Sequence, residues 1–202
     1  MSDCYYYEYA WDSSYCYPKS FVLKNKLGLI DGKELAEAER ELTALNLAEI
    51  KRKPVRGKFD LKHLQAIHKA IFRDVFTWAG KLRTVDIAKG NQFCLCQHLE
   101  TYAATIFDKL KAENYLLDTP ATQLPARLAY YLSEINVLHP FREGNGRAQR
   151  VFIEQLAQKA GYHVDFSDVS SQEMIEASAL SFAKEYDKMI AMFERILASL
   201  DP

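Results

Sequence analysis

The chain has 202 residues, which is enough for one domain to bury a sizeable core without disulfide bonds or a structural metal. Its 26 Lys and Arg residues nearly balance its 27 Asp and Glu residues, and the formal net charge is -1. Such a balance produces no broad electrostatic field, so we expect no direct binding to nucleic acid and none to an anionic membrane.

The segment from Met1 to Trp11 carries tyrosines and acidic residues, and it lacks the basic start and apolar run of a secretory signal. No stretch reaches the ~18 consecutive apolar residues of a membrane-spanning helix. We therefore expect a soluble, cytoplasmic protein, with secretion as an effector as the alternative. The four cysteines are irregularly spaced without a C-x-x-C pair, which indicates free thiols and no metal site.

One mainly α-helical domain is expected over residues 1–202, because no linker or repeat divides the chain. Residues 1–30 form a tyrosine-rich arm that we expect to pack on the body. Helical periodicity then predicts about six to eight helices in all. The helical segments are 32–53, 61–75, 100–116, 122–138, 147–160 and 171–200, the last broken near its middle. The first helix should bury a stripe formed by Leu35, Ala38, Leu42 and Leu45, and Asp60 should cap the second.

A β-hairpin is predicted over Thr84–Cys96. Apolar residues alternate with polar ones on both sides of the turn residues Lys89-Gly90-Asn91. An isolated hairpin is only marginally stable. This one should therefore be packed against the helices or be used to hold something.

The connection between the fourth and fifth predicted helices reads His139-Pro-Phe-Arg-Glu-Gly-Asn-Gly-Arg-Ala-Gln-Arg150. The run Gly144-Asn145-Gly146 tolerates left-handed backbone angles, so its N–H groups can converge on an anion at the start of a helix. Arg147 and Arg150 are three residues apart and can reach toward one phosphate chain. The loop therefore predicts a site for a di- or triphosphate.

Two further side chains of this loop suggest chemistry. Glu143 places a carboxylate beside the expected anion, and a magnesium ion held by that carboxylate and phosphate oxygens would bridge the two. His139 is the group of the motif that can accept a proton near neutral pH. Each feature alone has a commoner explanation, such as a tight turn or a helix end. Their conjunction describes in-line transfer from a nucleoside triphosphate to a hydroxyl.

The loop resembles the signature of the Fic family, H-x-F-x-[DE]-G-N-G-R-x-x-R, with every specified position filled. Further similarity to the family lies in Tyr17-Pro18, 22–28, 76–80 with Arg83, and 160–162. The resemblance implies the Fic fold, a helical bundle with a β-hairpin flap beside the active site. Glycine at position 146 is similar to the AMP-transferring majority, whereas a phosphate-transferring branch has a bulkier residue there.

The resemblance also implies roles for individual residues. His139 would deprotonate the target hydroxyl, and Glu143 would bind Mg²⁺. The phosphates of ATP would be bound by Gly144, Asn145, Gly146, Arg147 and Arg150. The flap would dock a target segment by backbone pairing, with a working part that consists of Lys89, Gly90, Asn91, Gln92 and Phe93.

Regulation and biological role follow from the same resemblance. Many members carry an inhibitory helix with the motif [ST]-x-x-x-E-[GN], and the nearest match here, Ser181 to Tyr186, fails at its last position. The chain thus resembles the class that a separate antitoxin inhibits, and we expect a small helical antitoxin to insert a glutamate near Arg150. The implied protein is a bacterial toxin that modifies a Ser, Thr or Tyr hydroxyl, with a topoisomerase as the family-implied target. An effector directed at host GTPases is the alternative.

Two other functions stay open. The same fold could transfer a different phosphate-bearing group, such as phosphate itself or another nucleoside monophosphate. A non-enzymatic helical binding module with a vestigial nucleotide site is the alternative from a different class. The balanced charge and the intact His139 count against that module. The remaining histidines and the N-terminal tyrosines are expected to serve packing or surface roles, namely His63, His68, His98, His163, Tyr5, Tyr6, Tyr7 and Tyr9.

Overall fold

The computed structural model describes residues 14–200, so the N-terminal tyrosines at positions 5, 6, 7 and 9 lie outside the described residues. Within that range the chain forms seven α-helices and two small antiparallel sheets, which confirms the mainly α class. None of these helices is both long enough and apolar enough to cross a membrane.

The first two helices begin where the sequence predicts. Helix α1 spans Gly32–Arg52, and the Asp31 carboxylate caps it by accepting hydrogen bonds from two backbone N–H groups of the first turn. Helix α2 spans Leu61–Phe72 and is capped by Asp60, so it ends three residues earlier than predicted.

The predicted apolar stripe of α1 is wrong at Leu45, which is 70% exposed. The helix instead turns Thr43, Asn46 and Ile50 toward the interior. A buried hydrogen bond accompanies this change: the side-chain amide of Asn46 donates to the Ile71 carbonyl, near the end of α2, at 3.0 Å. Satisfying that buried carbonyl rotates the helix face away from the purely apolar pattern.

The remaining helices follow in the predicted order. They are α3 (Leu99–Ala112), α4 (Leu124–Leu138), α5 (Asn145–Lys159), α6 (Ser171–Phe182) and α7 (Asp187–Ile196). The break expected between residues 171 and 200 is confirmed between α6 and α7. A pair of strands was not predicted: β3 (Tyr162–Val164) pairs antiparallel with β4 (Leu197–Ser199).

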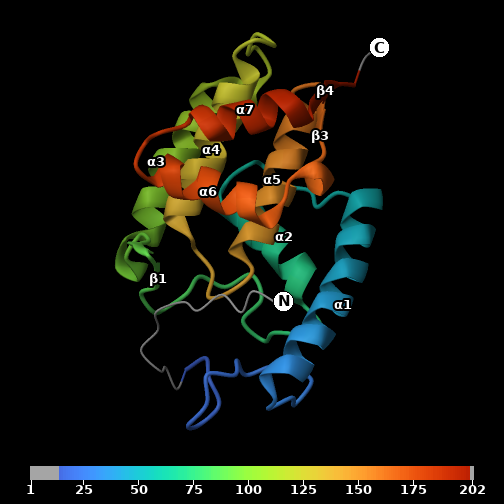
Figure 1. Cartoon of the computed structure of the whole chain (residues 1–202), viewed down its shortest axis with the longest axis vertical. Helices are drawn as coiled ribbons and strands as arrows, with labels where there is room; N and C mark the ends of the chain where they lie inside the picture. The colour runs from blue at the N-terminus through green and yellow to red at the C-terminus, as the bar shows by residue number, and fades with distance from the viewer. Residues whose placement is uncertain (1–13, 201–202) are drawn as a thin grey trace.

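Helices α4 and α5 run side by side through the middle of the molecule, with α1 along one side and α3 along the other (Figure 1). The core lies between α2, α4 and α5. Its fully buried side chains include Leu64, Ile67, Ile71, Phe72, Leu128, Ile135, Phe141, Phe152, Ile153 and Leu156. The end of α4 and the start of α5 are therefore held by a rigid interior, and the loop between them inherits that rigidity.

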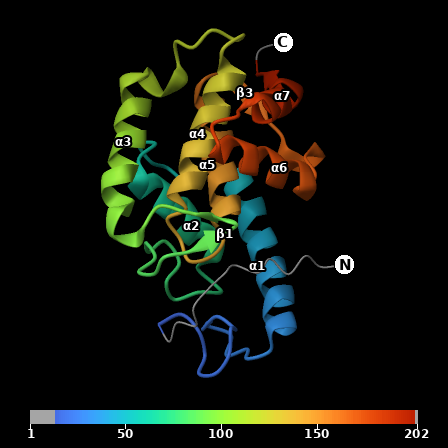
Figure 2. The same cartoon turned by 60° about the vertical axis from the view of Figure 1, so that its left-hand side comes forward.

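The predicted hairpin is present but shorter than residues 84–96. Strand β1 (Ala88–Lys89) pairs with β2 (Asn91–Gln92), and the turn residue Gly90 has φ +70°. One further hydrogen bond, from the Phe93 N–H to the Ile87 carbonyl at 3.3 Å, crosses the hairpin, and the next N–H, that of Cys94, donates to the Val137 carbonyl of α4 at 3.0 Å instead. Figure 2 shows this flap beside the ends of the central helices, at the opposite end of the molecule from β3.

Candidate active site

The loop between α4 and α5 begins with a residue in an unusual conformation. His139 caps the carboxyl end of α4 with left-handed backbone angles, φ 43° and ψ 59°, and its N–H donates to the Ile135 carbonyl at 3.0 Å. A left-handed residue at this position ends a helix and turns the chain sharply. The side chain of His139 is thereby directed to the pocket between the loop and the flap.

The Asn145 side chain closes the loop on itself. Its carbonyl oxygen accepts from the Phe141 N–H at 2.9 Å, and its amide donates to the Phe141 carbonyl at 2.8 Å. Asn145 is buried and is absent from the described lining of the pocket. Of the three residues predicted to surround an anion, its side chain therefore shapes the loop, while Gly144 and Gly146 line the pocket.

Gly144 is required by both conformation and space. Its φ is +81°, and a Cβ at this position would lie 2.1 Å from the ring of Phe72. Its N–H donates to a carboxylate oxygen of Glu143 at 2.8 Å. The half-buried carboxyl group of Glu143 thus already occupies one N–H beside the start of α5. Desolvation raises the pKa of this carboxyl group, while the Gly144 N–H and the charge of Arg147 oppose the shift.

The histidine ring has a defined tautomer. Nδ1 of His139 lies 3.1 Å from the Asn136 carbonyl, which can only accept, so Nδ1 carries the proton and Nε2 is the basic nitrogen of the neutral ring. Burial lowers the pKa of His139 to about 3, assisted by the charges of Arg83 and Lys89 and opposed by the Asn136 carbonyl. The Phe93 ring stacks on this imidazole with a centroid distance of 3.8 Å.

A second histidine, His68 of α2, contacts the loop. The Gly80 N–H donates to Nδ1 of His68 at 2.9 Å, so the proton is on Nε2, which donates to the Glu143 carbonyl at 2.9 Å. The ring of His68 stacks on Phe141 at 3.9 Å. Burial lowers its pKa to about 4, which keeps it neutral. Its place in the second helix was predicted, with packing and surface roles both left open, but the contact with Glu143 was not predicted.

The two arginines of the loop take different directions. Arg147 forms an ion pair with Glu39 of α1 at 2.6 Å and donates to the hydroxyl of Thr43 at 3.1 Å. Nη1 of Arg150 lies 3.3 Å from the position that a Cβ on Gly146 would occupy. Both arginines line the pocket, but Arg147 also contacts Glu39 and Thr43 of α1.

The flap contributes to the same pocket. Lys89, Asn91 and Phe93 line it together with His139, whereas Gly90 and Gln92 are not part of the described lining. Burial lowers the pKa of Lys89, while the nearby negative charge of the Glu143 carboxylate opposes this shift.

The pocket has a volume of about 410 Å³, which suits a small-molecule ligand. Helices α4, α5 and α6 also line it, with Leu132, Gln149, Met174, Ile175, Ser178 and Phe182. The sequence did not assign a role to these α6 residues. Within residues 14–200, no group of three or more His, Cys, Asp or Glu side chains could hold a metal ion by itself.

Comparison with known proteins agrees with this geometry. Residues 58–157 match the model of the Fic/DOC family. Over 91% of its length, the chain is 39% identical to the probable protein adenylyltransferase Fic of Salmonella typhimurium, of which it covers 92%. The chain belongs to the Fic/DOC family.

Other family members resemble this Fic chain over most of its length. It is 44% identical to the protein adenylyltransferase VbhT of Bartonella schoenbuchensis over 91% of its residues, and it spans 38% of that relative. A Fic domain from Bartonella quintana with bound ADP has a TM-score of 0.87 at 31% identity, covering 93% of this chain and 96% of that one. BepC from Bartonella tribocorum with bound AMPPNP also has a TM-score of 0.87, at 26% identity and 92% and 97% coverage. These similarities confirm the expected Fic fold.

Proposed function

We propose that this Fic chain is a protein adenylyltransferase, which moves AMP from ATP to a hydroxyl side chain of a target protein and releases pyrophosphate. The observation that carries the proposal is the tautomer of His139, whose basic Nε2 belongs to a ring that lines the pocket between flap and motif loop. Relatives that are 37–44% identical over 91% of the chain are named protein adenylyltransferases, some of them as probable ones. The AMPPNP bound to BepC supports ATP as the donor.

In the proposed reaction, Nε2 of His139 accepts the proton of the target hydroxyl while the hydroxyl oxygen attacks the α-phosphorus of ATP. The bond from that phosphorus to its bridging oxygen breaks, and pyrophosphate leaves. A pKa near 3 makes His139 a weak base. The negative charge of a bound triphosphate would raise this pKa, because a nearby anion favours the protonated ring.

The phosphates would be held by the N–H groups at the start of α5, flanked by Gly144 and Gly146, and by Arg147 and Arg150. Glu143 fits a magnesium ion, since it presents one half-buried carboxyl group to the pocket beside those N–H groups and Mg²⁺ is usually held by one or two carboxylates plus phosphate oxygens. When bound, the ion would offset the negative charge of the triphosphate.

We assign the whole chain to one Fic domain, with an arm over residues 1–30, the flap over 84–96 and the motif loop over 139–150. Residues 89–93 of the flap would dock the target segment. The two-residue strands β1 and β2 leave backbone groups of the hairpin edges available for pairing with an extended segment, and both residues of β2 are exposed. Phe93, beside His139, would then contact the modified side chain.

A separate antitoxin is the proposed inhibitor. A second pocket, of about 400 Å³, lies between α1, α5 and the segment that follows β3, and Arg147 and Arg150 line both pockets. A helix in this second pocket could bring a glutamate to Arg150 and occupy the place of a phosphate. The proposed role is therefore a bacterial toxin, with a topoisomerase as target and a host GTPase as the alternative.

The activity is tested by incubating the purified chain and magnesium with a bacterial lysate and ATP labelled at the α- or the γ-phosphate. Only the α-label should enter protein, and His139→Ala should abolish transfer. Entry of the γ-label would replace AMP transfer with phosphate transfer. Co-purification with the product of a neighbouring gene, lost on replacing one of its glutamates, tests the antitoxin proposal.

A further inference from the structure

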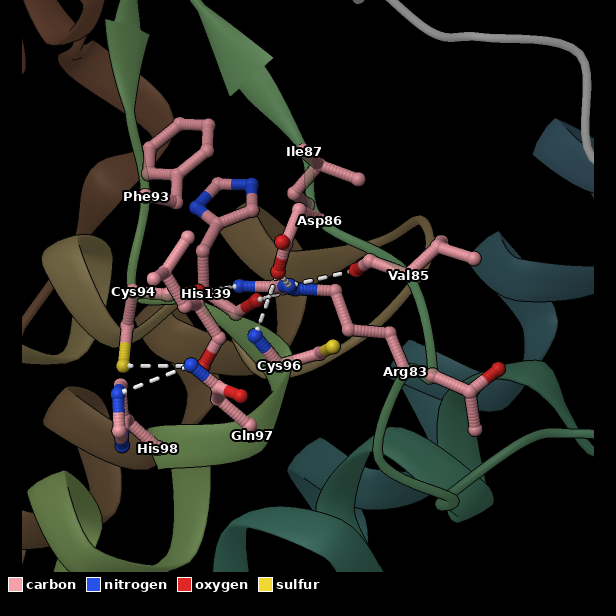
Figure 3. Close-up of polar contacts among 12 residues, drawn as sticks. Arg83, Val85, Asp86, Ile87, Phe93, Cys94, Cys96, Gln97, His98 and His139 are labelled. Atoms are coloured by element: carbon pink, nitrogen blue, oxygen red, sulfur yellow. Dashed lines mark hydrogen bonds and ion pairs between the residues drawn. The ribbon is translucent and has the colours of Figure 1, made fainter.

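Arg83 lies beneath the flap and contacts three backbone segments at once. Its side chain is fully buried, and its guanidinium lies between the two ends of the flap and His139 (Figure 3). Nε donates to the His139 carbonyl at 2.8 Å, Nη1 donates to the Val85 carbonyl at 2.6 Å, and Nη2 donates to the Cys94 carbonyl. One side chain thus ties both ends of the flap to the residue proposed as the base.

The three carbonyl groups that accept from Arg83 lie outside the helices and strands. Val85 precedes β1 and Cys94 follows β2, so neither belongs to the short ladder of the flap. The His139 carbonyl lies just past the carboxyl end of α4, where the helix dipole favours a cation. A guanidinium offers five N–H donors in a fixed plane, which suits three separate acceptors. A lysine ammonium lacks this planar fork.

A second set of contacts places the flap against the same helix end. The Phe93 ring is 7% exposed and stacks on the His139 ring, with an angle of 15° between the planes. Asp86 accepts from the Cys96 N–H at 2.6 Å and lies 3.7 Å from Nη1 of Arg83, which gives the buried guanidinium a partly exposed counter-charge. The stacking of Phe93 on His139, like the hydrogen bond from the Cys94 N–H to the Val137 carbonyl, depends on the register of the flap relative to α4, whereas the Asp86 contacts hold the two ends of the flap together.

We propose that Arg83 is a positioning residue for the transfer reaction, which holds the flap in register over His139. This inference rests on the function proposed above. A misplacement of ~1 Å between a base and its substrate can lower a rate by about 100-fold. Arg83 is not among the residues that line the pocket, whereas Gly144, Gly146 and Arg150 are, so we expect the binding of ATP itself not to depend on it.

The test compares Arg83→Lys with Arg127→Lys. Arg127 is a matched control because it donates to both carboxylate oxygens of Glu113 from the opposite end of α4. Three quantities are measured in each variant: transfer of α-labelled AMP, ATP affinity by calorimetry, and the NMR shift of the His139 ring, assigned by comparison with His139→Asn. The stacked Phe93 ring should move that resonance upfield in the wild-type protein.

In Arg83→Lys we expect transfer to fall by about 100-fold, the upfield shift to be lost and the ATP affinity to be retained. Arg127→Lys should retain all three. The proposal is overturned if Arg83→Lys folds and keeps both the transfer rate and the His139 chemical shift of the wild-type protein. It is also overturned if ATP affinity falls together with the transfer rate, because that result indicates a structural role only. If the lysine variant does not fold, Arg83→Gln decides by the same readouts, and a failure of both to fold also overturns it. The His139 resonance reports the position of the flap even if the wild-type protein transfers no label. An absence of transfer by the wild-type protein would therefore reject the proposed function without deciding the role of Arg83, which the resonance decides.

Discussion

Replacing His68 with phenylalanine should destabilise the protein through two backbone groups. The new ring can keep the stacking on Phe141, but the Gly80 N–H and the Glu143 carbonyl lose their partners. An unpaired buried polar group costs about 1–3 kcal/mol, so the loss of partners for two such groups should lower the free energy of unfolding at pH 7.5 by about 2–6 kcal/mol.

The pH dependence of this loss is the sharper expectation. His68 has a pKa of about 4 in the folded protein and 6.5 as a model value, so it is a histidine that folding keeps neutral. Its contribution to stability is complete above pH 6.5 and is lost as the pH falls toward 4, at about 1.4 kcal/mol per pH unit. Between pH 6.5 and pH 5.0 the wild-type protein should lose about 2 kcal/mol of unfolding free energy through His68, and His68→Phe should lose none by this route.

The assay is urea unfolding of both proteins at pH 7.5 and pH 5.0. The destabilisation caused by His68→Phe should shrink by about 2 kcal/mol at the lower pH. His139 and the carboxyl groups are common to both proteins, so their titration cancels in the difference. An equal destabilisation at the two pH values would refute a buried, neutral His68 between Gly80 and Glu143.

Three further substitutions test the site. Gly144→Ala should lower the melting temperature far more than Gly90→Ala, because both have positive φ but only the first Cβ would meet an aromatic ring, at 2.1 Å; equal melting temperatures would contradict this. Glu143→Gln should abolish the magnesium dependence of ATP affinity, measured by calorimetry with the metal or with a chelator, and a retained dependence would place the metal elsewhere. Glu39→Gln should tighten ATP binding by about 1 kcal/mol, roughly fivefold, since it removes the carboxylate paired with Arg147; weaker binding would show that Glu39 orients this arginine.

The helices and the motif loop could be predicted because their signals are local. Apolar spacing, the cap at Asp60 and the glycines of the loop all act within a few residues of one another. The contacts of His68 and Arg83 could not be predicted in this way. Their partners lie 75 and 56 residues away and are backbone carbonyls, which every residue possesses.

The strands β3 and β4 were missed for a related reason. Each is three residues long, and they pair across a separation that includes two helices. Residues 197–199 continue the helical pattern of α7, so periodicity alone assigned them to that helix. The pairing with Tyr162 to Val164, together with the Leu200 N–H that donates to the Gly161 carbonyl at 3.0 Å, ends the helix instead.

The spacing of Arg147 and Arg150 on one helix face predicted that both bind a single phosphate chain. In the structure, however, Arg147 is already ion-paired with Glu39 of α1. The ion pair of Arg147 with Glu39 is well shielded, with side chains 25% and 15% exposed, so a phosphate approaching Arg147 must compete with a carboxylate already there. Arg150 lies beside Gly146 and borders the second pocket. A glutamate supplied to Arg150 by a partner helix would reproduce, on the second arginine, the arrangement that Glu39 makes on the first. The proposed inhibition by a partner carboxylate would therefore use the same kind of ion pair that Glu39 of α1 already forms with Arg147.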